Sequence, residues 1–303
     1  MYAVASVELD GVFVPNVTPF NRHGEIDRGA LRDLVDYWVG AGVSGLVVNA
    51  STGEAPFLNR EERKTVLKLV LDRAGGKVRV VAGTGAMGTR ETIEFTRDAS
   101  DYGADAALVV APFFFKPSDE ELFQHFASLL ASVDMPVILY NVPKFTGYSV
   151  NPRVIERIVF ECGNLVGVKD SSGSPGTMAE IIRLVGDKIS VLSGSADMIL
   201  PTLALGGRGA IVAVANVIPE TCVSLYEAFK NGDLGEAGRL QLRASFVNKV
   251  LVREHSQIAA IKAALNFIGR PAGFPRRPLR PLSPKEEQEV FEALKLIALI
   301  EML

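Results

Sequence analysis

Short apolar runs alternate strictly with amphipathic helical patterns, and this alternation restricts the possible folds more than any other feature. Between residues 11 and 230, eight apolar runs are each followed by a stretch with helical periodicity. The runs are continuously apolar, which is typical of parallel strands that are covered on both faces. The expected strands are 11–17, 45–49, 78–82, 106–110, 136–140, 165–169, 189–193 and 209–214.

Eight strand–helix units predict a closed barrel and not an open sheet. Strict β-α alternation indicates a parallel sheet, and eight repeats are the number that a (β/α)₈ TIM barrel requires. Such barrels occupy about 250 residues as one unit. We therefore expect an α/β protein with a catalytic barrel over residues 1–230 and a C-terminal helical region over residues 231–303 packed on it. The helices expected in this region are 234–252, 257–268 and 284–300.

Composition disfavours several classes of function. The formal net charge is −3 over 303 residues, so we expect neither nucleic acid nor a membrane as a partner. The two cysteines, Cys162 and Cys222, lie far from each other and from any His cluster, which predicts no disulfide framework and no metal site. The stretch 1–9 lacks the features of a signal peptide, and no apolar run is long enough to span a bilayer. We expect a cytoplasmic protein.

Lys169 is the most informative polar residue, because it closes the sixth expected strand and barrel chemistry lies at the C-terminal strand ends. Partial burial disfavours an ammonium group and lowers its pKa. A neutral amine forms a Schiff base with ketones. The alternative interpretation is a lysine whose ammonium group extends from the strand end into water.

Two other strand ends supply residues suited to a 2-oxo acid. Ser51 and Thr52 follow the second strand, where hydroxyl and backbone N–H groups bind carboxylates and the start of the next helix favours an anion. Tyr140 ends the fifth strand and is expected to act as a general acid/base. An imine on Lys169 acts as an electron sink, which permits C–C bond formation or cleavage beside it. The simpler alternatives are that Ser51 and Thr52 cap the next helix and that Tyr140 is an ordinary buried tyrosine.

Two other kinds of site are disfavoured. No histidine ends an expected strand, which argues against a His-based metal site and a Ser-His-Asp triad. Gly83, Gly85 and Gly88 form a G-x-G-x-x-G pattern between a strand and a helix, but the next strand ends without an acidic residue for a ribose. We interpret the pattern as a tight turn and expect no nucleotide cofactor.

The motifs at the strand ends resemble those of the dihydrodipicolinate synthase / N-acetylneuraminate lyase family of pyruvate-dependent class I aldolases. The matching stretches cover nearly the whole chain and include 45–54 (GLVVNASTGE), 81–85 (VAGTG), 140–143 (YNVP), 167–171 (GVKDS), 192–194 (LSG) and 206–211 (GGRGAI). The resemblance implies a Schiff base on Lys169 with no separate cofactor, and a homotetramer built as a dimer of dimers. The residue roles that it implies are proton relay for Tyr140, binding of the pyruvate carboxylate for Ser51 and Thr52, proton transfer between Ser51 and Tyr140, and lining of the pocket for Gly194 and Ile211.

Two departures from the family pattern concern the second substrate. Members that make dihydrodipicolinate typically carry an arginine at the position of Phe145, and a phenyl ring cannot bind a carboxylate as a guanidinium does. They also place a tyrosine of the neighbouring subunit at the position of Phe114, which lacks the hydroxyl. With Phe145 as a substrate-binding residue, the sequence favours a lyase that cleaves or forms a 2-oxo-4-hydroxy acid, such as a 2-keto-3-deoxy sugar acid, from pyruvate and a small aldehyde.

Two alternatives stay open. The first is 4-hydroxy-tetrahydrodipicolinate synthase, which condenses pyruvate with aspartate semialdehyde. The second is a non-catalytic barrel that only binds pyruvate, because a fold does not fix a function. The presence of both Tyr140 and Lys169 argues against this second alternative.

Overall fold

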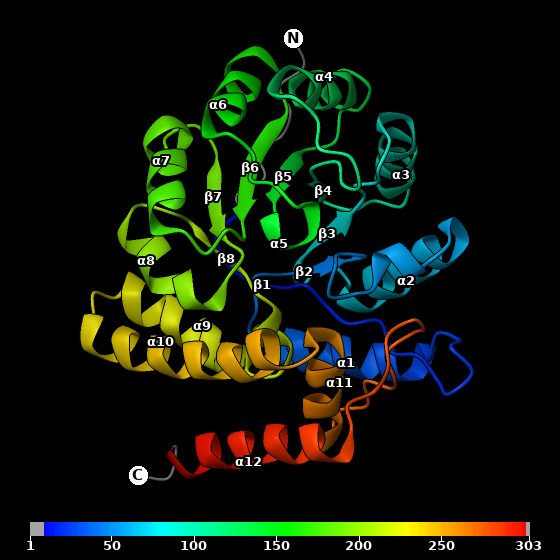
Figure 1. Ribbon diagram of the computed structural model, residues 1–303, viewed down its shortest axis with the longest axis vertical. Helices are drawn as coiled ribbons and strands as arrows, with labels where there is room; N and C mark the ends of the chain where they lie inside the picture. The colour runs from blue at the N-terminus through cyan, green and yellow to red at the C-terminus, as the bar shows by residue number, and fades with distance from the viewer. Residues whose placement is uncertain (1–8, 301–303) are drawn as a thin grey trace.

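The computed structural model describes residues 9–300 and forms a closed barrel of eight parallel strands (Figure 1). Neighbours in sequence pair with each other, and β1 pairs with β8 to close the ring. The predicted (β/α)₈ TIM barrel is therefore confirmed. The strands are β1 Gly11–Val14, β2 Gly45–Val48, β3 Arg79–Gly83, β4 Ala106–Val110, β5 Val137–Asn141, β6 Leu165–Asp170, β7 Ser190–Ser193 and β8 Gly209–Ile211.

Helices surround the barrel, and three more follow it in the sequence. The barrel helices are α1 Arg28–Gly40, α2 Arg60–Ala74, α3 Thr89–Asp101, α4 Asp119–Leu130, α5 Pro143–Thr146, α6 Pro152–Glu161, α7 Pro175–Val185, α8 Ile199–Ala204 and α9 Pro219–Lys230. The C-terminal helices are α10 Leu234–Asn248, α11 Gln257–Phe267 and α12 Pro284–Ile300. The short elements are the 3₁₀ turns η1 Ala55–Phe57, η2 Ala196–Met198 and η3 Ala213–Asn216, and the π-helix η4 Lys249–Glu254. Residues 1–8 and 301–303 lie outside the described residues. They include the first residues of the predicted barrel region, the last residues of the predicted C-terminal region, and nearly all of the stretch 1–9 that was considered as a signal peptide.

Side-chain caps explain where several helices begin. Ser118 accepts a hydrogen bond from the backbone N–H of Glu121, whose carboxylate accepts one in return, so a capping box begins α4. Asn59 and Glu62 form the same arrangement at the start of α2. Asp27 accepts a hydrogen bond from the backbone N–H of Ala30 at the start of α1.

Three predicted elements differ from the observed ones by three or more residues at one end. Strand β1 stops at Val14 instead of residue 17, because Pro15 has no N–H with which to continue a ladder. Strand β8 stops at Ile211, and a 3₁₀ turn begins at Ala213. The helix expected over 234–252 is α-helical only to Asn248 and continues as the π-helix η4. The four-residue helix α5 was not predicted, since it is too short to show periodicity.

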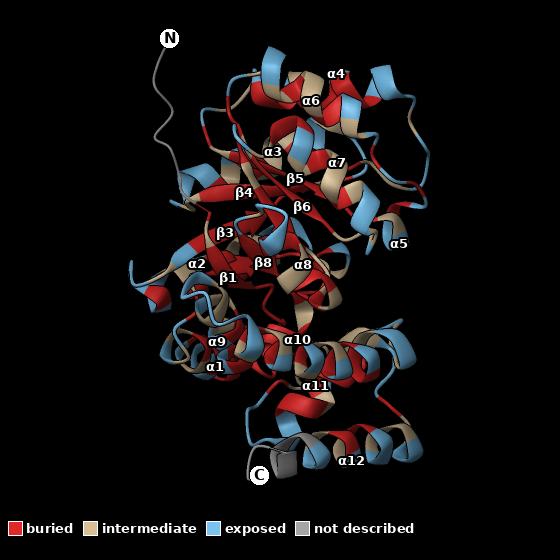
Figure 2. Cartoon of the chain, turned by 90° about the vertical axis from the view of Figure 1, so that its left-hand side faces the viewer, coloured by how far each residue is buried: buried red, intermediate tan, exposed pale blue. Residues whose placement is uncertain are grey.

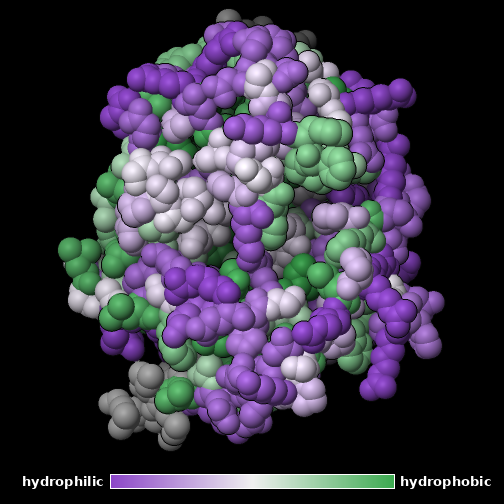
Figure 3. Space-filling view, viewed as in Figure 1, coloured by the Kyte–Doolittle hydropathy of each residue, from purple (hydrophilic) through white to green (hydrophobic). Residues whose placement is uncertain are grey.

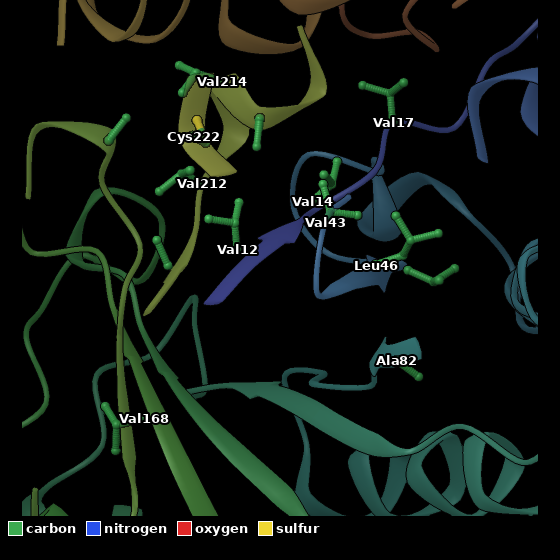
Figure 4. Packing of buried hydrophobic residues seen from close by; sticks show 14 of the residues in the cluster. Val12, Val14, Val17, Val43, Leu46, Ala82, Val168, Val212, Val214 and Cys222 are labelled. Carbon is green, nitrogen blue, oxygen red and sulfur yellow. The ribbon is translucent and has the colours of Figure 1, made fainter. Parts of the chain in front are cut away.

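Two hydrophobic layers stabilise the barrel, one inside the ring of strands and one between the strands and the helices. Along β1, Phe13 belongs to the inner layer, while Val12 and Val14 on either side belong to the outer one. Figure 4 shows Val12 and Val14 in the outer layer, together with Cys222 of α9. Figure 2 shows the buried strands at the centre of the molecule, and Figure 3 shows a face dominated by hydrophilic side chains with hydrophobic ones scattered among them.

The glycine-rich turn after β3 has a packing explanation. A Cβ atom at Gly83 would lie 2.1 Å from the carbonyl oxygen of Asn49, and one at Gly85 would lie 2.6 Å from the backbone nitrogen of Val110. Both positions therefore require glycine because neighbouring backbone approaches closely. This agrees with our interpretation of the G-x-G-x-x-G pattern as a turn.

The C-terminal helices lie together on one side of the barrel, below it in Figure 1. Helix α10 packs along α9, and α11 packs against α12. Within residues 9–300, none of the helices has both the length and the apolar character needed to cross a membrane.

Candidate active site

Lys169 and Tyr140 are brought together by the register of two neighbouring strands. In the parallel pair β5–β6, Tyr140 lies opposite Lys169, and Asn141 lies opposite Asp170. The Lys169 Nζ atom lies 4.0 Å from the centre of the Tyr140 ring. Both side chains line the same pocket at the C-terminal ends of the strands. The amine and the phenol are therefore adjacent.

Burial controls the electrostatics of Lys169. The residue is 3% exposed, and desolvation lowers the pKa of its amine, an effect that the nearby Tyr140 opposes in part. Among the described residues, no carboxylate forms an ion pair with Lys169. The interpretation in which its ammonium group extends into water is therefore wrong, and the surroundings favour the neutral amine.

Asn141 and Asp170, which were not among the predicted site residues, connect these two strands by a side-chain hydrogen bond. The Asn141 Nδ2 atom donates to Oδ1 of Asp170 at 2.6 Å, and the Ser172 hydroxyl donates to Oδ2 at 2.6 Å. Burial raises the pKa of Asp170, an effect that these hydrogen bonds oppose. A signal was present: Asn141 and Asp170 have the same separation (170 − 141 = 29) as Tyr140 and Lys169 (169 − 140 = 29).

The pocket has a volume of about 450 Å³ and brings all seven predicted site residues together. They are Ser51, Thr52, Tyr140, Phe145, Lys169, Gly194 and Ile211. Pyruvate has only six heavy atoms, so this volume leaves room for a second small molecule. Four further lining residues come from the C-terminal region and were not predicted, because nothing in their local sequence distinguishes them; they are Asn248, Val252, Arg253 and Gln257.

Ser51 and Thr52 do not cap a helix. Helix α2 is capped by Asn59, and the 3₁₀ turn η1 separates it from the loop. The capping interpretation is therefore wrong, and so is the expectation that the start of a following helix would favour an anion at this loop. Thr52 is 2% exposed, and its hydroxyl accepts a hydrogen bond from Gln257 at 3.4 Å.

The strand end after β7 approaches the one after β6 closely. A Cβ atom at Gly194 would lie 1.9 Å from the Ser171 Oγ atom and 3.0 Å from the Asp170 carbonyl oxygen, so a larger residue would displace the Ser171 side chain. The Ser171 hydroxyl is buried, lines the pocket and has no hydrogen-bond partner among the described residues. A buried hydroxyl without a partner is available to bind a substrate oxygen.

Two cations and one carboxylate lie at the mouth of the pocket. Lys144 on α5 donates to the Val252 carbonyl oxygen at 3.3 Å. The Arg253 Nη1 atom lies 3.6 Å from Asp197, which also accepts from Asn248 at 2.9 Å. Arg253 and Val252 belong to the π-helix η4, an element that is frequent at functional sites. The mouth therefore has an excess of positive charge.

The two phenylalanines that depart from the family pattern lie in different surroundings. Phe145 is 49% exposed and lines the pocket, with the Lys144 Nζ atom 5.7 Å from its ring centre. Phe114 is 82% exposed, has a φ of +79° and does not line this pocket. A role for position 114 in a neighbouring subunit stays a prediction.

Comparison with known proteins identifies one family. The family model described as "Dihydrodipicolinate synthetase family" matches residues 8–297. The 4-hydroxy-tetrahydrodipicolinate synthase of Methanothrix thermoacetophila is 42% identical over 270 residues, which are 89% of this chain and 90% of that protein. The synthase of the same name from Methanospirillum hungatei is 40% identical over 89% of this chain and 93% of that protein.

Solved structures show the same similarity. The dihydrodipicolinate synthase of Aquifex aeolicus superposes with a TM-score of 0.91 at 35% identity, covering 95% of this chain and 98% of that chain. YagE of E. coli K12, a prophage protein of the dihydrodipicolinic acid synthase family in complex with pyruvate, superposes with a TM-score of 0.93 at 31% identity, covering 96% and 99%.

These names bear on the predicted activities. They support 4-hydroxy-tetrahydrodipicolinate synthase, the first alternative, better than the 2-keto-3-deoxy sugar acid lyase that the sequence favoured. The individual residue roles, the lack of a cofactor and the homotetramer stay predictions.

Proposed function

The chain belongs to the dihydrodipicolinate synthetase family, and from this we propose that it is a 4-hydroxy-tetrahydrodipicolinate synthase, which condenses pyruvate with aspartate semialdehyde. It is a Schiff-base-forming enzyme of the class I aldolase type, which argues against the alternative of a non-catalytic barrel. The observation that carries the proposal is the buried Lys169 amine beside Tyr140, in a pocket whose mouth is positively charged.

The first half of the reaction captures pyruvate. The neutral Lys169 amine adds to the C2 carbonyl carbon, and loss of one water leaves an iminium ion. Tyr140 is proposed to supply the proton that the departing oxygen needs. Ser51, Thr52 and Ser171 line the same pocket and offer hydroxyl groups to the carboxylate.

The second half makes the new bond. The iminium ion withdraws electrons, so a proton leaves the C3 methyl group and an enamine forms. The enamine C3 then adds to the aldehyde carbon, and the aldehyde oxygen takes up a proton. Water or an amine of the product finally displaces Lys169, which returns to its neutral form.

Lys144 and Arg253 support an aldehyde that carries a carboxylate. Phe145 provides no charge, but these two cations lie at the mouth of the pocket that holds Lys169. A guanidinium group binds a carboxylate through two N–H groups. We propose that Arg253 takes the role that an arginine at position 145 has in other members of the family.

One observation favours a second candidate. The Phe145 ring lines the pocket and cannot donate hydrogen bonds. This supports the lyase for a 2-keto-3-deoxy sugar acid, which uses the same imine but needs no second carboxylate.

Two assays test these proposals. Borohydride reduction in the presence of pyruvate should leave a pyruvyl adduct on Lys169, located by peptide mass spectrometry. Turnover of aspartate semialdehyde with pyruvate, compared with cleavage of 2-keto-3-deoxygluconate, then separates the two candidates. No adduct on Lys169 would refute both of them.

A substitution at the mouth tests the role of Arg253. We expect Arg253→Leu to raise the KM for aspartate semialdehyde by about tenfold, because a charged hydrogen bond is lost, and to leave the KM for pyruvate unchanged. Arg183→Leu on α7 is the matched control, since both arginines pair with a carboxylate and their side chains are 56% and 58% exposed. If both substitutions change the KM for aspartate semialdehyde equally, the proposed role of Arg253 in binding this substrate is contradicted.

A further inference from the structure

A second buried lysine lies below the loop that carries Ser51 and Thr52. Lys262 on α11 pairs with Glu54, which follows this loop, with Nζ 2.5 Å from Oε1. Their side chains are 1% and 0% exposed. The two residues are 208 positions apart in the sequence. This ion pair therefore connects the C-terminal helices to a loop of the barrel.

The hydrogen bonds of this ion pair are complete. The Lys262 ammonium also donates to the carbonyl oxygens of Thr18 and Phe274, each at 2.7 Å, which uses its three N–H groups. The second Glu54 oxygen accepts from the backbone N–H of Arg276 at 2.8 Å. A buried ion pair is tolerated only when its remaining donors and acceptors are satisfied in this way. The pair thus holds four segments of the chain together at one point.

The loop above the pair has an unusual backbone. Residues 50–53 lie between Asn49 and Glu54, whose φ angles are +56° and +60°. Residues other than glycine keep such backbone angles only where surrounding contacts hold them. The Asn49 side chain donates to the Arg63 carbonyl oxygen at 2.9 Å, and Glu54 is held by Lys262. Both ends of the loop are thus anchored by side-chain contacts.

Helix α11 reaches the same loop at a second point. Gln257, in the first turn of α11, donates to the Thr52 hydroxyl and lines the pocket. Thr18, whose carbonyl oxygen accepts from Lys262, donates its own hydroxyl to the Gly53 carbonyl oxygen at 2.7 Å. Helix α11 therefore holds Thr52 and Glu54 directly, and it holds Gly53 through Thr18.

We propose that Glu54, Lys262 and Gln257 are positioning residues that hold loop 50–53 ready for the carboxylate of the 2-oxo acid. The C-terminal helices are then part of the substrate-binding site and more than a cover on the barrel. This inference rests on the proposed function, because it assigns carboxylate binding to Ser51 and Thr52. Lys262 itself does not line the pocket, so it takes no part in the chemistry.

The test compares three substitutions with a control on the same helix. Glu54→Gln and Lys262→Met each break the ion pair, and Gln257→Ala removes one hydrogen bond to Thr52. Ile261→Ala is the control. The Ile261 side chain is fully buried in the outer hydrophobic layer and precedes Lys262 in the sequence, so its loss removes packing but none of the hydrogen bonds described above. If a single substitution prevents folding, the double variant Glu54→Gln/Lys262→Met leaves no unpaired charge and replaces it.

Two measurements are made on each variant. The first is amide hydrogen exchange of the peptide containing residues 50–54, without substrate. The second is the pyruvate concentration that gives half-maximal borohydride trapping. We expect faster exchange, and a half-saturating concentration raised about tenfold or more in the ion-pair variants. For Gln257→Ala we expect a rise of about threefold.

Two results would overturn the inference. One is unchanged loop exchange and unchanged half-saturation in all three variants. The other is an equal change in Ile261→Ala, which would show general loss of stability in place of positioning. A wild-type protein that traps no pyruvate would instead refute the proposed function, and the exchange measurement would still test the loop.

Discussion

Lys169 and Lys262 are both buried, yet their surroundings give them different chemistry. Lys169 is 3% exposed and lies against a tyrosine ring, whereas Lys262 is 1% exposed and is surrounded by one carboxylate and two carbonyl oxygens. Burial lowers the pKa of both amines, to about 8 for Lys262, where Glu54 opposes the shift. The carboxylate and the two carbonyl oxygens that surround Lys262 favour its charged form.

The difference teaches that burial by itself does not make a nucleophile. A reactive amine needs an unshared electron pair and free space in front of it. Burial favours the neutral form of Lys169, and the pocket that it lines provides the space. Three acceptors occupy the three N–H groups of Lys262, so this lysine is held in its charged form. One lysine is available for chemistry and the other stabilises the structure around it.

The largest expected effect comes from Lys169. Replacement by Met should lower kcat/KM by roughly 10⁴-fold or more, because the nucleophile is lost. The stability of the Lys169→Met variant should stay close to that of the wild type, since Met fills a similar buried volume without a charge. Steady-state kinetics and thermal unfolding measure the two quantities. Residual activity within tenfold of the wild type would contradict the assignment.

Tyr140→Phe should have the next largest effect. Loss of the hydroxyl removes the proposed proton relay, which is worth about 10²-fold or more in kcat. The ring remains, so Lys169 stays buried and its pyruvate adduct should still be trapped, at a lower rate. Rapid-mixing measurement of imine formation tests this. A rate equal to that of the wild type would assign the proton transfer to another group.

Lys262→Met should have the opposite effect to replacement of Lys169, with a large loss of stability and retained imine formation. It leaves the Glu54 carboxylate buried without its partner, which we expect to cost about 3 kcal/mol of unfolding free energy. Lys169 is untouched, so an adduct should still form at saturating pyruvate. Urea denaturation measures the loss of unfolding free energy. Lys188→Met is the control, because the Lys188 side chain is 51% exposed. A loss below about 0.5 kcal/mol, typical of surface substitutions, would contradict the structural role.

The smallest expected effect is a displacement along the pH axis. Imine formation needs the neutral amine, so its rate should rise with pH and level off above the pKa of Lys169. Because burial lowers this pKa, the midpoint should lie below the ordinary lysine value of about 10.4. Borohydride trapping between pH 6 and 11 measures the profile. A midpoint at or above the ordinary value would show that the amine is exposed in solution.

Much of the fold was predictable because strand and helix periodicity are local properties. Eight apolar runs indicated the barrel, and Lys169, Tyr140, Ser51 and Thr52 were found because strand ends in a barrel share one face. Gly194 and Ile211 came from the family resemblance alone. The same reasoning failed for the helix after residue 248. Continuing periodicity did not reveal that the backbone widens into the π-helix η4, two residues of which line the pocket.

The sequence by itself determined the barrel, the amine at its mouth and the phenol 29 residues before it (169 − 140 = 29). It also supplied the family resemblance. Only the tertiary structure decided which lysine is free to react, and which residues of the C-terminal helices reach the site. The physical reason is that the surroundings of a buried charge come from several segments of the chain. Thr18 and Glu54 lie more than 200 residues from Lys262 in the sequence, and Phe274 lies 12 residues from it, yet all three contact its ammonium group.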